Sequence, residues 1–328
     1  MKKTVLIGLI CVAAGILVMG LAFASVGFDP ARLSTAPRYE QKTMQAAAKD
    51  ASAPDHPDMP SYEQKSLQSD SVSAIEIQDV SMPLRVGLSP DAQIHITYFE
   101  NEYETYQITR GDVLRFEKIV RQPWYANLVR IDFQDVYLEL LLPAGFEGRL
   151  SLDTENGDMT FCGASAGRTE AHCANGKIQL DTFDASALAL STSNGSISLK
   201  QLTLSGDLTV KTSNGKVDLD GVQAVRADVR TSNGEIELEN LRVQTVTAQT
   251  SNGSIELENV GAAQQIELTT SIGDITGTVL GQMRDFSIQT HWDGFSACSL
   301  PQSMPGGEKT LTVRSDMGKI DLSFIPGP

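Results

Sequence analysis

Apolar and polar residues alternate along most of this chain, and after Pro143 the alternation is organised into a repeat. One phrase occurs three times in nearly the same form, as TSNGKVDLDGV at 212–222, TSNGEIELENL at 231–241 and TSNGSIELENV at 250–260. The third and fifth residues after each asparagine are apolar, and so are the fourth and sixth residues before it. This period-two pattern predicts two half-buried β-strands that meet at each Asn-Gly pair.

The nearly constant length of the repeat predicts how the strands are arranged. Spacings of 19 or 20 residues separate the corner glycines Gly157, Gly176, Gly195, Gly215, Gly234, Gly253 and Gly273. Weaker copies follow at Gly294 and Gly318. A fixed period of this kind is typical of a solenoid, so we expect an all-β fold, a β-solenoid (β-helix) of about nine coils. Because Asn-Gly is also a hairpin signal, an antiparallel meander is the alternative.

The corner residues predict side-chain ladders along the stack. Glycine accepts positive φ without penalty and asparagine tolerates it, so we expect that conformation at each corner. Stacked asparagine amides can hydrogen-bond to one another along the axis. The predicted turn ladder is Asn194, Gly195, Asn214, Gly215, Asn233, Gly234, Asn252 and Gly253. Threonines two residues before each asparagine form a second expected ladder, at Thr192, Thr212, Thr231 and Thr250.

One group of charged residues has the spacing of a shared surface. Four and six residues after the corner asparagine, on the polar side of the strand, lie Asp218, Asp220, Glu237, Glu239, Glu256 and Glu258. Stacked coils would bring these carboxylates into one outward patch, although like charges on neighbouring strands are unfavourable. One interpretation is a solvated face that prevents aggregation. Another is a site for Ca²⁺ or for a polycationic partner.

The N-terminal part predicts a membrane setting. Residues 4–28 carry no charge and follow Lys2 and Lys3, which predicts a transmembrane anchor over 1–28 with the rest of the chain outside the cytoplasm. The alternative is a cleaved signal peptide ending near Ala24. Residues 29–70 are rich in Ala, Pro, Ser and Asp and predict a disordered linker. Residues 71–143 alternate less regularly and predict a β-rich part preceding the repeat of 144–328.

Composition and motifs exclude several functions. A net charge of −15 argues against nucleic-acid binding. The histidines His56, His95, His172 and His291 are scattered, and no catalytic motif occurs. Cys162, Cys173 and Cys298 show no CxxC spacing, so we expect neither zinc nor a disulfide framework, although Cys162 and Cys173 leave one pairing open. The aromatic segment around Trp292 interrupts the period and is expected to cover the end of the stack, with a ligand-binding loop as the alternative.

The repeated TSNGxIxL motif and the lead-in VYLELLLPAGFEGRLSLDTENGDM resemble a bacterial family of unknown function labelled "putative adhesin". The resemblance covers about residues 71–324 and implies a β-solenoid in a single-pass envelope protein without catalytic residues. This chain departs from the motif at Ile272, Asp293 and Met317, where asparagine is replaced.

We therefore expect a non-catalytic, membrane-anchored β-solenoid that acts as an adhesin or binding scaffold at the bacterial cell envelope. Its partner would be a cationic group, an envelope protein or a polysaccharide, and no cofactor is required apart from the Ca²⁺ considered above. One alternative is an accessory component of envelope-stress signalling that binds another membrane protein. A further alternative, a polysaccharide-cleaving β-helix enzyme, needs two differentiated carboxylates in a cleft, which a row of equivalent residues does not provide.

Overall fold

The computed structural model describes residues 39–48, 71–121, 136–292 and 297–326. They form two units, and the larger one, Thr43–Tyr98, Gln107–Lys118 and Tyr137–Pro328, contains the repeat. The predicted all-β fold is confirmed, because the only helical element in these residues is the short 3-10 turn η2 (Met283–Asp285). The predicted membrane helix lies outside the described ranges, and so does most of the predicted linker. Glu40–Ala48, however, forms strand β1, so the expectation of a disordered linker is wrong for this stretch. Within those ranges no helix is long and apolar enough to cross a bilayer.

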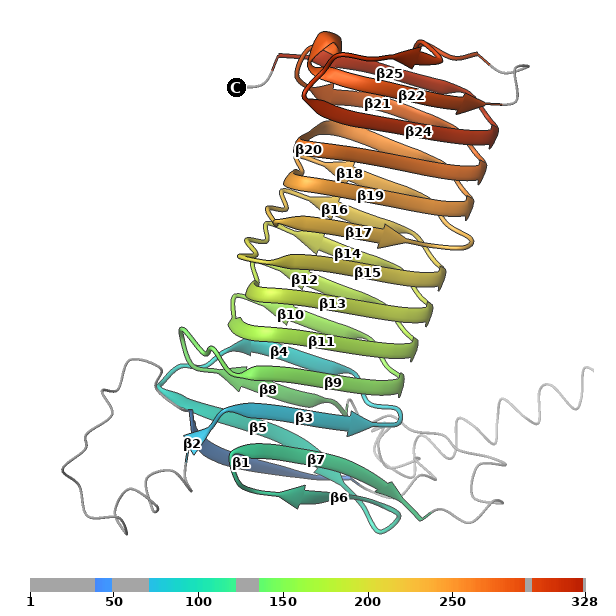
Figure 1. Ribbon diagram of the computed structural model, residues 1–328. Helices are drawn as coiled ribbons and strands as arrows, with labels where there is room; N and C mark the ends of the chain where they lie inside the picture. The colour runs from blue at the N-terminus through green and yellow to red at the C-terminus, as the bar shows by residue number, and fades with distance from the viewer. Residues whose placement is uncertain (1–38, 49–70, 122–135, 293–296, 327–328) are drawn as a thin grey trace, which may run out of the picture. The chain divides into compact units, whose positions relative to one another are not determined.

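Each coil of the repeat adds one strand to each of two sheets (Figure 1). Sheet B holds the strands before the Asn-Gly corner, β9 (Arg149–Asn156), β11 (Ser165–Asn175), β13 (Asp184–Asn194), β15 (Asp207–Asn214), β17 (Arg226–Arg230) and β19 (Arg242–Asn252). Sheet A holds those after it, β10 (Met159–Cys162), β12 (Ile178–Asp181), β14 (Ile197–Lys200), β16 (Val217–Asp220) and β18 (Ile236–Glu239). The long strand β20 (Ile255–Ile272) passes through both sheets.

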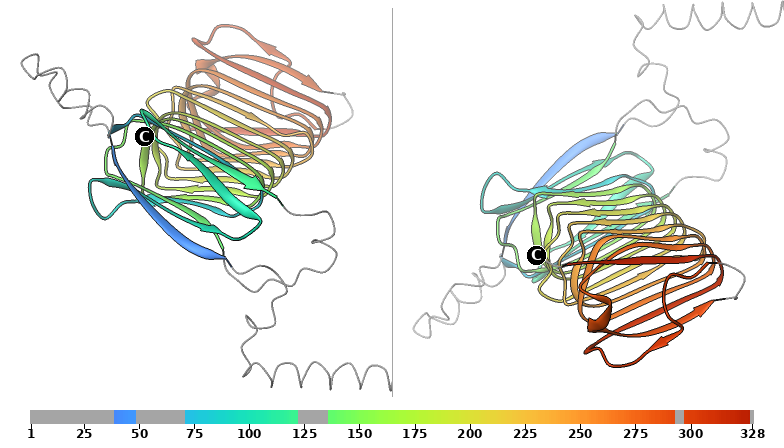
Figure 2. Two further views of the ribbon diagram at one scale, coloured as in Figure 1. Left: turned by 90° about the horizontal axis from the view of Figure 1, so that it is seen from below. Right: turned by 90° about the horizontal axis from the view of Figure 1, so that it is seen from above.

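Neighbouring coils pair in parallel, with equivalent repeat positions in register. Val217 is paired with Ile236, and Ile236 with Ile255. On the other sheet Val229 is paired with Ala248. The parallel pairing confirms the solenoid and excludes the meander. Seen along the stack, the coils lie one behind another (Figure 2).

The core lies between the two sheets. All apolar positions predicted to point inward are buried; for example, Ile236 and Leu238 of β18 and Ala227 and Val229 of β17 have no exposed surface. Polar residues alternate with them on the outer faces. Burial of these rows stabilises each coil only when its neighbours are present, which is the reason for the repetition.

The strand order departs from the chain order at both ends of the stack. The N-terminal strands are β1 (Glu40–Ala48), β2 (Ser71–Val72), β3 (Ala74–Asp79), β4 (Leu84–Leu88), β5 (Gln93–Glu100), β6 (Glu104–Thr109), β7 (Val113–Val120) and β8 (Leu138–Leu142). β3 lies between β7 and β9, and β4 lies between β8 and β10. The segment predicted to precede the solenoid therefore contributes to both of its sheets.

At the C-terminal end the last strands are β21 (Ile275–Leu280), β22 (Phe286–Trp292), β23 (Ser303–Met304), β24 (Lys309–Met317) and β25 (Ile320–Ile325). β24 is inserted between β20 and β22. An antiparallel strand lies along one outer edge at each end, β23 against two residues of β22 in sheet B and β5 against β8 in sheet A. Such strands shield part of an edge from pairing with further chains.

The smaller unit includes Phe99–Tyr106 and the described residues next to Lys42 and Ile119. Within it the Tyr39 hydroxyl donates a hydrogen bond to Glu104 at 2.8 Å, and the Asn101 side chain accepts two backbone N–H groups at 2.8 Å each. These contacts close a tight turn that ends in β6.

Candidate functional site

The Asn-Gly corners form a continuous ladder. The side-chain amide of each asparagine donates to the side-chain oxygen of the asparagine in the preceding coil, from Asn175 onto Asn156 at 3.0 Å through to Asn252 onto Asn233 at 2.9 Å. Inside the corner, Thr192, Thr212, Thr231 and Thr250 each donate to the carbonyl oxygen of the preceding corner glycine at 3.0–3.1 Å. Each coil from Asn194 to Asn252 is therefore held to the one before it by these two side-chain hydrogen bonds as well as by the backbone pairing of its strands.

The expectation of positive φ at these corners is wrong for Gly195, Gly215, Gly234 and Gly253. Of the corner glycines, Gly273 and Gly318 have positive φ, at 148° and 158°. The left-handed conformation lies at the opposite corner, with φ from 51° to 68° at Gly163, Thr182, Gln201, Gly221, Asn240 and Asn259. Glycine is required at the Asn-Gly corner for a steric reason. A Cβ on Gly234 would lie 1.9 Å from the carbonyl oxygen of Gly215, and one on Gly195 would lie 1.8 Å from that of Gly176.

The predicted acidic residues lie together on the outer face of sheet A. Asp218, Glu237 and Glu256 are register partners across β16, β18 and β20, and Asp220, Glu239 and Glu258 form the next row. We call these six residues the acidic ridge. The ridge side chains on β16 and β18 are partly buried by their neighbours, whereas Glu256 and Glu258 are exposed. The ladder thus sets the register that brings the carboxylates into rows.

Lys216 and Glu235 lie beside the acidic ridge on the same face of the sheet. Lys216 forms an ion pair with Glu237, and its Nζ lies 3.7 Å from Glu235 Oε2. Carboxylate oxygens of Glu235, Glu237 and Glu256 come within 4.8 Å of one another. The hydrogen bond to Glu237 raises the pKa of Lys216, so its charge is held in place. The ammonium group already occupies part of the region in which a cation would be bound.

Two carboxyl groups in this region have raised pKa values, because they are partly buried and because other negative charges lie beside them. Partial burial, followed by the charge of Glu256, raises the pKa of Glu235 above its ordinary value, against the influence of Lys216. Partial burial also raises the pKa of Glu239, and Asp220 and Glu258 add to it. Holding these charges in rows is therefore unfavourable near neutral pH. A cationic partner would relieve this cost.

The corner ladder and the acidic ridge lie within a part of the chain that matches a known family. The Toastrack DUF4097 model matches residues 72–292, more than half of the chain. This chain belongs to the Toastrack DUF4097 family. This match confirms the resemblance to a family of unknown function that the sequence indicated.

Three solved structures are similar to this Toastrack chain. A "putative adhesin" from Bacteroides fragilis NCTC 9343 has 14% sequence identity over 88% of this chain and 99% of that chain, with a TM-score of 0.42. A "putative adhesin" from Parabacteroides merdae ATCC 43184 has 13% identity over 87% and 96%, with a TM-score of 0.47. A "putative lipid binding protein" from Parabacteroides distasonis ATCC 8503 has 15% identity over 86% and 96%, with a TM-score of 0.49. No curated protein matches the sequence.

Glu235, which lies beside the acidic ridge, was not among the residues predicted from the sequence. It stands two positions after Asn233, on the same polar side of the strand as Glu237, and belongs to the same alternation. Acidic residues recur in three coils at the fourth and sixth positions after the asparagine, whereas the second position is acidic in only one of these three coils. Counting every outward position would have found both Glu235 and Lys216.

The remaining candidate residues of the Toastrack chain are dispersed. His95 pairs with Asp91 at 2.8 Å, His172 bonds Ser191, and His56 lies outside the described residues. Cys162, Cys173 and Cys298 are free thiols. Cys173 occupies a ladder position and contacts the carbonyl oxygen of Gly157 at 3.2 Å, as the threonines of the following coils do.

Proposed function

We propose that this Toastrack protein is a non-catalytic binding scaffold, held on the outer side of the bacterial membrane by its N-terminal apolar segment, and that the acidic ridge contacts a cationic partner. The observation that carries the proposal is the register of the ridge, in which Asp218, Glu237 and Glu256 are direct strand neighbours. Since adjacent like charges destabilise the sheet, retaining them in consecutive coils is best explained by a ligand that offsets the repulsion.

The geometry of the ridge supports binding rather than catalysis. Its carboxylates project from one flat sheet at equivalent positions, and hydrolysis of a glycosidic bond needs an acid and a base that differ in protonation and face each other across a substrate. The cation that fits is Ca²⁺ or a basic segment of an envelope protein. Lys216 already neutralises part of the ridge, which favours a partner that brings several spaced positive charges over a single metal ion.

The test is a titration of the full chain, purified in a mild detergent, with Ca²⁺ and separately with an oligolysine peptide. The ridge variant carries Glu237→Gln, Glu239→Gln, Glu256→Gln and Glu258→Gln. The matched control makes the same change in net charge on sheet B, with Asp153→Asn, Asp184→Asn, Asp207→Asn and Glu267→Gln.

We expect calorimetry to show saturable binding of the peptide by the wild type and by the control, and no binding by the ridge variant. Equal loss in both variants would mean that only net charge matters. Absence of binding to either ligand would leave the ridge as a solvated face and contradict the proposal.

The membrane anchor has a separate test. N-terminal sequencing of the protein from bacterial membranes gives Met1 if the segment is a retained anchor. A new terminus just after Ala24 would show that it is a cleaved signal. Crosslinking in cells identifies the partner, and recovery of one membrane protein in place of an external polymer would favour the envelope-signalling alternative.

A further inference from the structure

A trough follows β13 on the outer face of sheet B, opposite the ridge. The outward side chains of β13 are small, namely Ala187, Ala189 and Ser191. Longer side chains flank them, Arg168, Glu170 and His172 on β11 and Asp207, Thr209 and Lys211 on β15. Two hollows of about 330 and 440 Å³ open here and share Ala189 and Thr209, so they are continuous along the strand.

The floor of the trough offers no free backbone. β13 is paired in parallel with β11 on one side and with β15 on the other over its central residues. An extended peptide that binds by strand addition needs an open sheet edge. A ligand in this trough must therefore be recognised by the side chains of its walls, which present hydroxyl, carboxylate and nitrogen groups above a floor of methyl groups.

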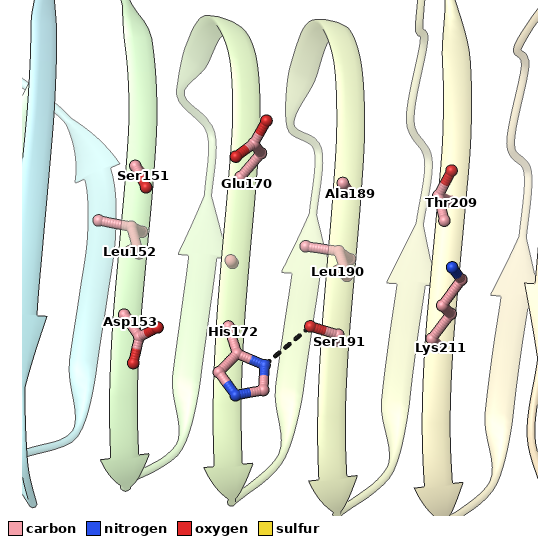
Figure 3. Close-up of a pocket in the computed structure, with 11 residues that line it drawn as sticks. Ser151, Leu152, Asp153, Glu170, His172, Ala189, Leu190, Ser191, Thr209 and Lys211 are labelled. Carbon is pink, nitrogen blue, oxygen red and sulfur yellow. Dashed lines mark hydrogen bonds between the residues drawn. The ribbon is translucent and has the colours of Figure 1, made fainter.

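Charge is distributed unevenly along the walls. At one end Glu170 accepts hydrogen bonds from Arg168 at 2.8 Å and from Arg149 at 3.1 Å, which lower its pKa. Because two guanidinium groups face one carboxylate, this group keeps a net positive charge. At the other end His172 Nδ1 lies 2.8 Å from Ser191 Oγ, and Lys211 stands on the other side of Ser191 (Figure 3).

Lys211 has no hydrogen-bond or ion-pair partner among the described residues. Arg230, its register partner on β17, is paired with Asp228 at 3.0 Å. The nearest carboxylate in the same row is Asp153, which lies beyond His172 on β9 (Figure 3). This end of the trough is therefore suited to an anionic group between His172 and Lys211.

We propose that the trough binds an acidic oligosaccharide. The apolar faces of its sugar rings lie on Ala187 and Ala189, its hydroxyls bond the polar walls, and a carboxylate reaches His172 and Lys211. From Ala187 to Ser191 the strand extends about 13 Å, the length of a short oligosaccharide. The inference is independent of the ridge, because the two sites lie on opposite sheets.

The experiment titrates the full chain with trigalacturonic acid at low ionic strength, with maltotriose and a hexaglutamate peptide as comparison ligands. Ala189→Tyr fills the trough, and Thr247→Tyr places the same ring at the equivalent row position of β19 as its control. Lys211→Gln removes the unpaired charge, and Lys200→Gln on sheet A is its control. Melting temperatures establish that each variant is folded.

We expect saturable binding of trigalacturonic acid that Ala189→Tyr weakens by at least about tenfold and Lys211→Gln by about fivefold, with both controls unchanged. Lys211 is exposed, so its variant keeps the test valid if Ala189→Tyr unfolds. No binding by the wild type, or full binding by a folded Ala189→Tyr variant, would overturn the proposal. If maltotriose bound equally well, the proposed contact between the ligand carboxylate and His172 and Lys211 would be wrong. If hexaglutamate bound more strongly, the ligand would be an acidic peptide and the oligosaccharide proposal would be wrong.

Discussion

Each coil reverses direction at two corners, and the two corners differ in their residues and in their backbone conformation. At the Asn-Gly corner the residues are nearly invariant from coil to coil, whereas the opposite corner uses glycine, threonine, glutamine or asparagine at one position. That opposite corner is the one with positive φ, the conformation usually taken to demand glycine or asparagine. The comparison teaches that this chain repeats glycine where the backbone of the neighbouring coil leaves no room for a side chain, and varies the residue at the left-handed corner, where side-chain contacts between coils, such as Asn259 onto Asn240 at 3.2 Å, occur in some coils only.

The largest expected effect comes from adding one carbon atom to the strict corner. Gly234→Ala places Cβ 1.9 Å from the carbonyl oxygen of Gly215, and neither backbone can move without breaking the register. We expect a loss of about 3 kcal/mol or more in the free energy of unfolding, measured by chemical denaturation.

Two controls show whether the steric explanation is correct. Gly111→Ala has no heavy atom within 4 Å of the new Cβ, and for Gly221→Asn at the left-handed corner the nearest atoms belong to the flexible side chain of Gln201, which can turn away. Each is expected to change stability by less than about 1 kcal/mol. A Gly221→Asn variant as unstable as Gly234→Ala would remove the difference between the corners.

The asparagine side chains give the next effect. Asn233→Ala deletes the bond to Asn214 and the bond from Asn252, both of 2.9 Å, and we expect a loss of about 1–2 kcal/mol. Gln201→Gly at the other corner, where φ is 53° and the Gln201 side chain has no hydrogen-bond partner among the described residues, keeps the left-handed backbone and is expected to stay within about 0.5 kcal/mol of the wild type. Equal melting temperatures for the two variants would contradict the comparison.

The buried threonines allow a matched pair within the strict corner. Thr231 donates to the carbonyl oxygen of Gly215 at 3.1 Å, whereas the hydroxyl of Thr154, at the same repeat position, is buried without a hydrogen-bond partner. Thr231→Val should therefore cost about 1 kcal/mol, and Thr154→Val should be neutral or slightly stabilising. If both changes cost the same, the hydroxyl bond is not part of the ladder's stability.

The smallest effect concerns the charged row beside the left-handed corner. Partial burial and the charges of Asp220 and Glu258 raise the pKa of Glu239 above its ordinary value of 4.5. The folded state thus holds this proton more tightly than the unfolded chain, and stability is lost as the pH rises through the folded pKa. Glu239→Gln should melt slightly above the wild type at pH 7 and at the same temperature near pH 3.5, where both are neutral.

Most of the solenoid could be predicted from the sequence, because period-two alternation fixes which side chains point inward and a constant repeat fixes what they meet. The ridge was predictable for the same reason, since Asp218, Glu237 and Glu256 hold equivalent positions. The steric requirement for glycine at the Asn-Gly corner could not be predicted from the sequence, because it depends on the distance between the backbones of two neighbouring coils. The trough was missed because the small residues of β13 matter only beside the long ones of β11 and β15.

The strand order at the ends could not be predicted either, since nothing local in the sequence specifies that β24 lies between β20 and β22. This insertion has a consequence for synthesis. Strand β24 is made after β22 and yet lies inside the stack, so β22 has no parallel neighbour until Lys309–Met317 has left the ribosome. The stack can grow coil by coil from its N-terminal end, but its C-terminal end closes only after β24 has been made, and a product truncated before β24 would be left with an open apolar edge.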